Sequence, residues 1–290
     1  MAQGYVMVLA ATLIWSGNFV LARILQESVP PFTIVVLRSL IAIAAMAPFV
    51  ARPMYYERRI ILKHIKYIAL TAFLGITVCN TIVYIAASSS NAVNLALIAI
   101  SSPIFTILFA RVLLKEALGF RKILSLVLAS SGVLYLVTGG AFSRLATLSF
   151  TPGDIWMLGQ ASSFALYSIL VQKRPLELSP LPFLFTMFVV GMIFVLPFFA
   201  WELVTAQRME FSERVIWAII FVGLGPSVLA YMSWNRSVAL IGPSKAAFVY
   251  YCLPLFSGIE AQYLLGEDLT FSHLISGALI LTGIILSTRD

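Results

Sequence analysis

Residues 103–132, PIFTILFARVLLKEALGFRKILSLVLASSG, return in altered form at residues 254–283 as PLFSGIEAQYLLGEDLTFSHLISGALILTG. A proline, a glutamate and a glycine keep the same spacing in both segments, at an offset of 151 residues (254 less 103): Pro103, Glu116 and Gly132 correspond to Pro254, Glu267 and Gly283. Charged residues are scarce in apolar segments, so this shared register points to a duplication. The chain is therefore built from two related halves.

The composition indicates that the chain lies in lipid. Hydrophobic residues make up 61% of it and charged residues 11%, whereas soluble domains are about half apolar and about a quarter charged. Residues 3–22 have no basic segment before them and are long enough to span a bilayer, so we expect a retained helix rather than a signal peptide. Cys79 and Cys252 lie in apolar runs, and we expect buried thiols without a disulfide or a metal.

Ten apolar runs are long enough to cross a membrane as helices, which takes about 20 residues each. They lie near residues 3–24, 31–51, 65–87, 92–114, 119–138, 153–173, 180–203, 213–239, 243–265 and 271–288. Proline, glycine and charged residues mark the breaks between them. The predicted fold is an all-α membrane protein with five spans in each half, the first half covering residues 1–140 and the second half residues 152–290.

Lysine and arginine fall unequally on the two sides of this arrangement. One side collects thirteen: Arg52, Arg58, Arg59, Lys63, Lys66, Arg111, Lys115, Arg121, Lys122, Lys173, Arg174, Arg236 and Arg289. The other side collects four: Arg23, Arg144, Arg208 and Arg214. Cytoplasmic loops carry the excess of basic residues, so we predict an inner-membrane protein with both termini in the cytoplasm. We read the net charge of +7 as this orientation signal rather than as a nucleic-acid site.

An odd number of spans per half means that the second half enters the membrane in the opposite direction. Glu116 then faces the cytoplasm and Glu267 the outside. Such an inverted repeat lets one fold alternate between inward-open and outward-open states. The predicted interruptions of the third and eighth spans, at Gly75 and at Gly225-Pro226, correspond at the same offset and suit a binding site and gate.

The chain resembles the drug/metabolite transporter superfamily, in the branch with two EamA-type repeats. The resemblance rests on Ile14-Trp15-Ser16-Gly17-Asn18-Phe19 and Ser163-Phe164-Ala165-Leu166-Tyr167, which align at an offset of 149, on Pro103 with Leu114-Lys115-Glu116, and on Pro254 with Leu265-Gly266-Glu267. It implies secondary transport of a small molecule without a cofactor, through a central cavity lined by spans one, three, four, six, eight and nine, with spans five and ten as scaffold. The chain is most similar to bacterial aromatic amino acid exporters, and the two halves suffice for a monomer.

Polar and aromatic residues inside the spans are the candidates for substrate binding, because such groups are costly in lipid unless they face a cavity or a partner. They are Trp15, Asn18, Arg38, Asn80, Tyr84, Asn94, Tyr231, Trp234, Asn235, Lys245 and Tyr250. Arg38 and Lys245 are candidate anchors for a substrate carboxylate. The alternatives are a snorkelling side chain or a partner for a helix C-terminus for Arg38, and an interfacial anchor for Lys245. For the aromatic residues the alternative is packing or an interfacial belt.

Glu260 is the acid that lies well inside a span. It is either a proton carrier or a neutral group hydrogen-bonded by Ser257, Gln262 or Tyr263. A cavity walled by aromatic rings, amides and a cation suits a zwitterion with an apolar or aromatic side chain. An organic cation would also suit the rings, but few acids are available to balance its charge.

Two other classes of protein fit less well. An enzyme would need a nucleophile with its base, or a metal site, yet His64 and His273 lie at span edges far apart in sequence, and the chain has no Gly-x-Ser-x-Gly motif. A channel would need a ring of like charges or a filter segment, and neither is visible.

Overall fold

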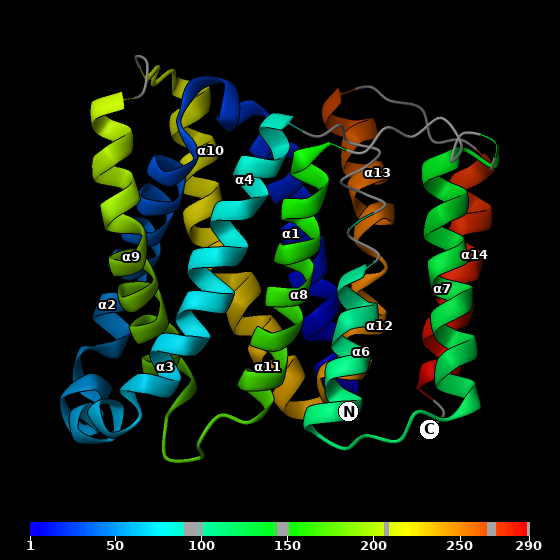
Figure 1. The fold of residues 1–290 in the computed structure, drawn as a ribbon, viewed down its shortest axis with the longest axis horizontal. Helices are drawn as coiled ribbons and strands as arrows, with labels where there is room; N and C mark the ends of the chain where they lie inside the picture. Colours follow the sequence, from blue (N-terminus) through cyan, green and yellow to red (C-terminus); the bar gives the residue numbers. More distant parts are fainter. Residues whose placement is uncertain are drawn as a thin grey trace.

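The computed structural model describes residues 1–89, 98, 101–141, 143, 151–205, 209–265 and 271–288, and its regular elements are all helices (Figure 1). In the first half these are α1 (Ala2–Ser28), α2 (Pro31–Lys63), α3 (Ile65–Ala72), the π-helical segment η1 (Phe73–Val78), α4 (Cys79–Ser89), α6 (Ser101–Leu113) and α7 (Phe120–Thr138). In the second half they are α8 (Pro152–Gln172), α9 (Pro180–Thr205), α10 (Glu213–Leu224), the π-helical segment η3 (Gly225–Ala230), α11 (Tyr231–Ile241), α12 (Pro243–Tyr250), α13 (Leu253–Leu265) and α14 (Phe271–Ser287).

These elements form the ten predicted spans, and the all-helical membrane fold is confirmed. Span three is α3 with η1 and α4, span eight is α10 with η3 and α11, and span nine is α12 with α13. Of span four, only the second part, α6, is fully described. Five of the described helical stretches are long and apolar enough to cross a bilayer by themselves: Pro31–Lys63, Ile65–Ala86, Phe120–Thr138, Pro180–Thr205 and Glu213–Ile241.

One predicted boundary is wrong, because α2 does not end near residue 51. The helix continues through Pro48 and Pro53 for 33 residues to Lys63. Each proline removes one backbone hydrogen bond but leaves the rest of the helix intact. At 1.5 Å per residue α2 is about 50 Å long, whereas the apolar layer is about 30 Å thick. The last turns therefore carry Arg58 and Arg59 beyond the apolar layer as helix rather than as loop.

Helices α7 and α14 pack against each other with reciprocal contacts between repeat-equivalent residues. A Cβ atom on Gly132 would lie 3.0 Å from the backbone oxygen of Ser276, and a Cβ atom on Gly283 would lie 2.8 Å from that of Ser125. Gly132 is equivalent to Gly283, and Ser125 to Ser276. When a residue of one helix contacts a residue of the other, and their repeat equivalents make the same contact in reverse, the two helices are related by a twofold axis. The two halves are thus related by a pseudo-twofold axis that passes between α7 and α14.

The first helix of each half is inserted into the other half. Helix α1 packs against η3, α11, α12 and α13, and α8 packs against η1, α4 and α6. The contacts of α1 with η3, α11 and α13 are the repeat counterparts of those of α8 with η1, α4 and α6. The two halves therefore interlock rather than meeting along one flat surface.

Helices α2 and α9 cap each other with carboxylates. At the start of α2, the N–H groups of Phe32 and Thr33 donate to Glu202 on α9 (3.1 and 2.6 Å). Just before α9, the N–H of Ser179 donates to Glu57 on α2 (3.0 Å). Helix N-termini leave unsatisfied N–H groups and favour negative charge. The reciprocal caps fix the two helices relative to each other at both ends.

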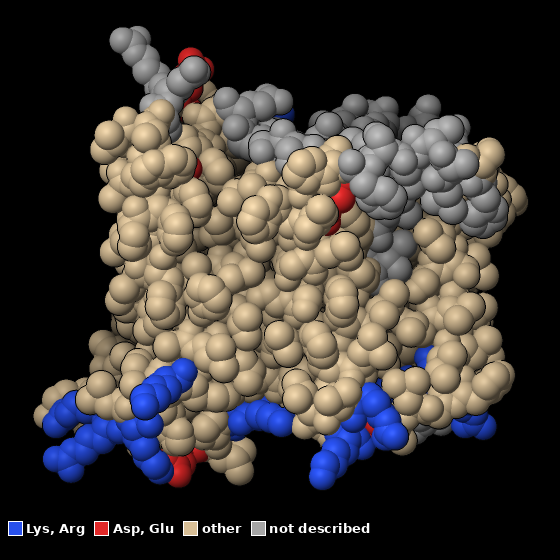
Figure 2. Space-filling model, in the orientation of Figure 1, with Lys and Arg blue, Asp and Glu red and all other residues tan. Residues whose placement is uncertain are grey.

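Basic side chains gather at one end of the molecule. In the face shown in Figure 2, Lys and Arg line the edge at which, in Figure 1, the chain begins. This distribution agrees with the unequal numbers of basic residues in the two sets of loops. The basic end lies opposite the end where α2 and α10 begin.

Candidate functional site

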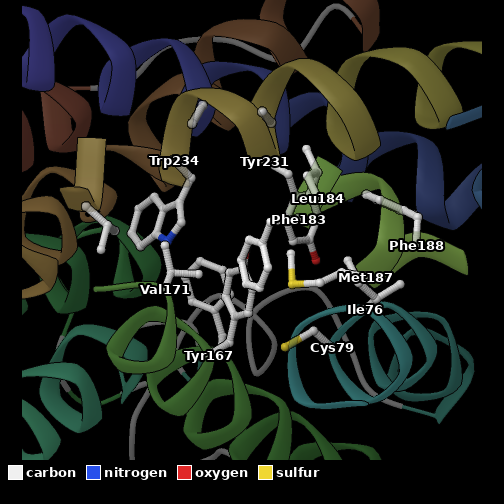
Figure 3. Close-up of a cluster of buried hydrophobic side chains, with 14 of the residues drawn as sticks. Ile76, Cys79, Tyr167, Val171, Phe183, Leu184, Met187, Phe188, Tyr231 and Trp234 are labelled. Carbon is white, nitrogen blue, oxygen red and sulfur yellow. The ribbon is translucent and has the colours of Figure 1, made fainter. Parts of the chain in front are cut away.

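A cluster of aromatic rings lies on the pseudo-twofold axis. Trp15 of α1 makes edge contacts with Phe164 of α8 at 5.4 Å and with Tyr231 of α11 at 5.5 Å between ring centroids. Its ring also lies 5.4 Å from Trp234 and 6.1 Å from Tyr250. Trp15 and Phe164 are equivalent at the offset of 149, so a contact between them lies on the axis. Figure 3 shows Trp234 and Tyr231 facing Tyr167 of α8 across the interior.

The interruptions predicted in spans three and eight are the π-helical segments η1 and η3. Their wider turns break the regular hydrogen-bond ladder, and such segments are frequent at functional sites. The carbonyl of Gly75 in η1 accepts a hydrogen bond from the Tyr231 hydroxyl, and that of Pro226 in η3 accepts one from Trp15 Nε1 (3.1 Å). Gly75 and Pro226 are repeat equivalents. A Cβ atom on Gly75 would also collide with the ring of Tyr167.

Two tyrosine–asparagine hydrogen bonds flank the aromatic cluster. The Tyr84 hydroxyl donates to Asn18 Oδ1 at 3.4 Å, and the Tyr167 hydroxyl donates to Asn235 Oδ1. Asn18 is equivalent to Tyr167, and Tyr84 to Asn235, so the two bonds are the same bond with donor and acceptor exchanged. Sequence reasoning had Tyr167 in the family motif but not among the candidate residues.

Arg38 is buried in the protein, with 1% of its surface exposed. Its Nε donates to Ser227 Oγ (2.9 Å) in η3, and one terminal nitrogen donates to the Tyr84 hydroxyl (3.1 Å). The ion pairs seen among the described side chains involve Lys63, His64 and Lys122, and not Arg38. The side chain therefore does not snorkel to an interface, and the structure rules out that alternative.

Asn80 lies one helical turn before Tyr84 on α4, so the two side chains share a face. It is 7% exposed, and its Nδ2 has no hydrogen-bond partner in the described part of the chain. Tyr84 accepts a hydrogen bond from Arg38 (3.1 Å) and donates one to Asn18 (3.4 Å), which lies one helical turn after Trp15. Arg38, Asn80, Tyr84 and the aromatic cluster are therefore neighbours.

The remaining candidates lie apart from this centre or outside the described residues. Asn94 is one of the residues that the structure does not describe. Lys245 is partly buried near the start of α12. The Glu116 carboxylate bonds Lys122 and Ser244 of α12, each at 2.6 Å, which supports a structural role for it.

Glu260 of α13 faces α1. Its Oε1 accepts a hydrogen bond from Ser16 Oγ at 2.9 Å, and its Oε2 is buried without a partner among the described residues. The sequence had pointed to Ser257, Gln262 or Tyr263 as partners. Ser16 directly follows Trp15 in α1. The Glu260 carboxylate is therefore bonded to the residue next to a member of the aromatic cluster.

Two inverted halves that interlock around a buried polar and aromatic centre define the architecture of a secondary membrane transporter. A family model described as the EamA-like transporter family matches residues 2–138 and 151–289. The chain belongs to this family of transporters, which are not enzymes. It is a multi-pass membrane protein with a small-molecule substrate.

Relatives and one solved structure extend the comparison. An uncharacterised transporter of Archaeoglobus fulgidus is 26% identical over 282 residues, which is 95% of this chain and 94% of the relative. A probable amino-acid metabolite efflux pump of Salmonella typhimurium is 23% identical over 96% of this chain and 92% of its own. A probable terminal-alkyne amino-acid exporter of Streptantibioticus cattleyicolor is 27% identical over 67% of this chain and 62% of its own. A crystal structure covering 100% of this chain and 97% of its own superposes with a TM-score of 0.79 at 16% identity, a level that speaks for the fold alone.

Proposed function

We propose that this protein exports neutral amino acids with aromatic or other apolar side chains from the cytoplasm. The observation that carries the proposal is that a buried cation lies next to a buried aromatic cluster. Arg38 donates to the Tyr84 hydroxyl, which donates to Asn18, one helical turn after Trp15 of the cluster. An amino acid has the matching chemistry, with a charged end and an apolar side chain.

The orientation of the protein in the membrane follows from the charge of the two ends. In this proposal the basic end faces the cytoplasm of a cell whose inner membrane holds the protein, with both termini inside. The halves formed by residues 1–140 and 152–290 make one complete unit, so a monomer suffices. Two relatives named as amino-acid or amino-acid metabolite exporters support the direction and the substrate class.

Alternating access in this proposal uses the two π-helical segments as hinges. Segments η1 and η3 hold equivalent positions, and each provides a carbonyl that accepts a hydrogen bond from a side chain of the other half. Tyr231 donates to Gly75 in η1, and Trp15 donates to Pro226 in η3. Breaking one of these bonds while keeping the other would open one side of the central cavity. The proposed site residues are Trp15, Asn18, Arg38, Asn80, Tyr84, Asn94, Tyr231, Trp234, Asn235, Lys245 and Tyr250.

The alternative substrate is a quaternary or multidrug cation, which the aromatic rings would suit. The buried cation Arg38 beside the rings would repel such a substrate. A channel is the second alternative, and it differs from a transporter in giving flux that neither saturates nor distinguishes stereoisomers.

Counterflow into proteoliposomes distinguishes these functions. Vesicles loaded with unlabelled L-tryptophan or L-phenylalanine should accumulate the labelled amino acid, with saturation and with preference for the L isomer. Empty liposomes and liposomes holding a denatured sample are the controls. Accumulation of tetraphenylphosphonium but of no amino acid would contradict the proposal, and linear, unselective flux would indicate a channel.

Glu260 is the proposed proton carrier if export is coupled to a proton gradient. Glu260→Gln should keep counterflow, in which no gradient acts, and lose the dependence of net export on the pH difference. Ser16→Ala is the matched control, because it removes the hydrogen bond to Glu260 and keeps the carboxyl group. His273 of α14 packs against Gly258 in the same region, so His273→Gln tests the other titratable group there. Unchanged pH dependence in Glu260→Gln would remove Glu260 from the mechanism.

A further inference from the structure

The centre of the protein is symmetric in its backbone and in several of its hydrogen bonds, but two pairs of equivalent positions that lie in contact differ in chemistry. At the offset of 149 that relates α2 to α9, Pro48 corresponds to Pro197, and both are prolines inside the helix. At the same offset Arg38 corresponds to Met187. At the offset of 151, Ser227 corresponds to Ile76.

The contact between these positions therefore exists twice, with opposite chemistry. On the α2 side, Arg38 Nε donates to Ser227 Oγ at 2.9 Å. On the α9 side, Met187 and Ile76 lie together in a hydrophobic cluster with Leu184 and Phe188 (Figure 3). One side of the pseudo-twofold axis thus carries a charge where the other side carries a thioether and an alkyl group.

Packing does not account for the arginine. A methionine fills the equivalent position in the other half, so the fold itself accepts an apolar side chain there. Arg38 lies seven residues inside α2, about 10 Å from its start, and a charge at such depth is costly unless it is paired. Its described partners, Ser227 and Tyr84, are neutral, and they occupy two of its five N–H groups.

A second unused donor lies beside it. The Nδ2 of Asn80 is buried and has no partner among the described residues, and a buried donor without a partner costs about 1–3 kcal/mol. Asn80 lies one helical turn before Tyr84, whose hydroxyl accepts a hydrogen bond from Arg38 at 3.1 Å. The site therefore offers one positive charge and spare N–H donors, and an anion with two oxygen atoms can accept from both.

We propose that Arg38 and Asn80 form the subsite for the carboxylate of the transported molecule, and that the apolar Met187 side receives its other end. The inference rests on the proposed function and deepens it by naming what the protein recognises. The substrate class is a carboxylate with an apolar tail, either an amino acid or the corresponding acid without the amino group. A related amine that lacks the carboxylate is not a substrate.

Access to this subsite requires helix movement. Arg38, Asn80 and Tyr84 are all buried, and the hydroxyl of Ser227 is held by the carbonyl of Val222 at 2.8 Å within the α10–η3 junction. An opening of η3 would move Ser227 away from Arg38 and release donors for the carboxylate. Substrate binding and opening of the second half are thus linked through one side chain.

The test compares ligands that differ only in the carboxylate. Wild-type protein in liposomes is assayed for counterflow of labelled tryptophan against unlabelled tryptophan, tryptophanamide, tryptamine and indole-3-propionate. Tryptophan and indole-3-propionate should compete, and tryptophanamide and tryptamine should compete about 10- to 100-fold less well, the factor expected for hydrogen bonds to a charged group. Equal competition by tryptophan and tryptophanamide would overturn the inference while leaving amino-acid export intact.

Arg38→Met makes the two sides of the axis alike. This variant should bind tryptophan and tryptophanamide within about twofold of each other, because the preference for the carboxylate is lost. Arg59→Met is the matched control, since Arg59 is an exposed residue of the same helix; it should keep the wild-type preference. A carboxylate preference retained in Arg38→Met would overturn the inference.

A binding measurement separates failure of the inference from failure of the proposed function. If no amino acid is transported, the proposed function is wrong, and thermal unfolding of wild-type protein with indole-3-propionate or indole-3-propionamide decides the inference by itself. Stabilisation by the acid but not by the amide, lost in Arg38→Met, supports the subsite. Equal stabilisation by both compounds, or by neither, overturns it, and this comparison in the wild type holds even if the variant does not fold.

Discussion

Tyr84 joins two side chains at the centre that the sequence separates widely. Its hydroxyl accepts from Arg38 at 3.1 Å and donates to Asn18 at 3.4 Å. Tyr84→Phe removes both bonds and leaves a buried charge with one partner fewer, so we expect a loss of about 1.5–3 kcal/mol in the free energy of unfolding. Thermal or denaturant unfolding in detergent measures it.

The second half provides the control for this substitution. Tyr167→Phe removes the equivalent hydroxyl, whose bond to Asn235 involves two neutral groups. A neutral hydrogen bond contributes about 0.5–1.5 kcal/mol, so Tyr167→Phe should cost less than Tyr84→Phe. Equal losses in the free energy of unfolding would mean that Tyr84 does not stabilise the buried charge of Arg38.

At the residue scale, the repeat offset predicted which residues lie together at the centre. The contacts that depend on how each helix is rotated about its axis could not be predicted from the sequence. The offset alone grouped Asn80, Tyr84, Tyr231 and Asn235, and the structure brings them together around one centre. The partner of Arg38 could not be predicted, because Ser227 lies 189 residues away and the contact depends on how α2 and η3 are rotated. Tyr167 was missed because the polar residues were compared at the offset of 151, whereas Asn18 and Tyr167 are equivalent at the offset of 149.

Helices α7 and α14 form the closest packed pair at the element scale, and glycine makes their approach possible. Gly132→Val would place its Cβ 2.9 Å from a side-chain carbon of Ile280 and 3.0 Å from the Ser276 backbone oxygen. Overpacking of this kind costs about 1–3 kcal/mol. We expect lower thermal stability with little change in substrate preference, measured by melting and by counterflow competition.

The control lies on the same pair of helices. A Cβ atom on Gly277 of α14 would meet nothing within 4 Å, and alanine favours a helix over glycine by about 1 kcal/mol. Gly277→Ala should therefore be neutral or stabilising. A stable Gly132→Val variant would show that α7 and α14 can separate without loss, contrary to a scaffold role.

At the element scale, hydropathy predicted the number of spans. It did not predict where α2 ends or what form the interruptions of spans three and eight take. The apolar runs located all ten spans, but the end of α2 was placed a dozen residues early because basic residues and Pro53 were read as a loop. The glycine and proline near the middle of spans three and eight predicted interruptions at matching points. The π-helical form of these interruptions, and the side-chain hydrogen bonds to the Gly75 and Pro226 carbonyls, are seen only in the folded chain.

The whole molecule combines a symmetric frame with an asymmetric centre. Reciprocal contacts at Gly132 and Gly283, and the paired caps from Glu57 and Glu202, keep the halves alike. A frame of this kind has two related shapes of similar stability, which alternating access requires. The difference between Arg38 and Met187 leaves that frame intact and gives the centre a polar and an apolar side.

Repeat-equivalent residues should therefore face opposite sides of the membrane. Lys63, just before α3, and Arg214, at the start of α10, are equivalent at the offset of 151, and both are exposed. Lys63→Cys and Arg214→Cys introduce one reactive thiol each, and loss of the exposed ion pair between Lys63 and Glu177 costs little. In intact cells a membrane-impermeant maleimide should label Arg214→Cys, and it should label Lys63→Cys only after the membrane is opened.

The wild type is the control, since Cys79 and Cys252 are 3% and 4% exposed and should not react. Labelling of both variants from the same side would contradict the inverted arrangement, and labelling of Lys63→Cys alone from outside would keep the inversion but reverse the orientation, placing the basic end outside.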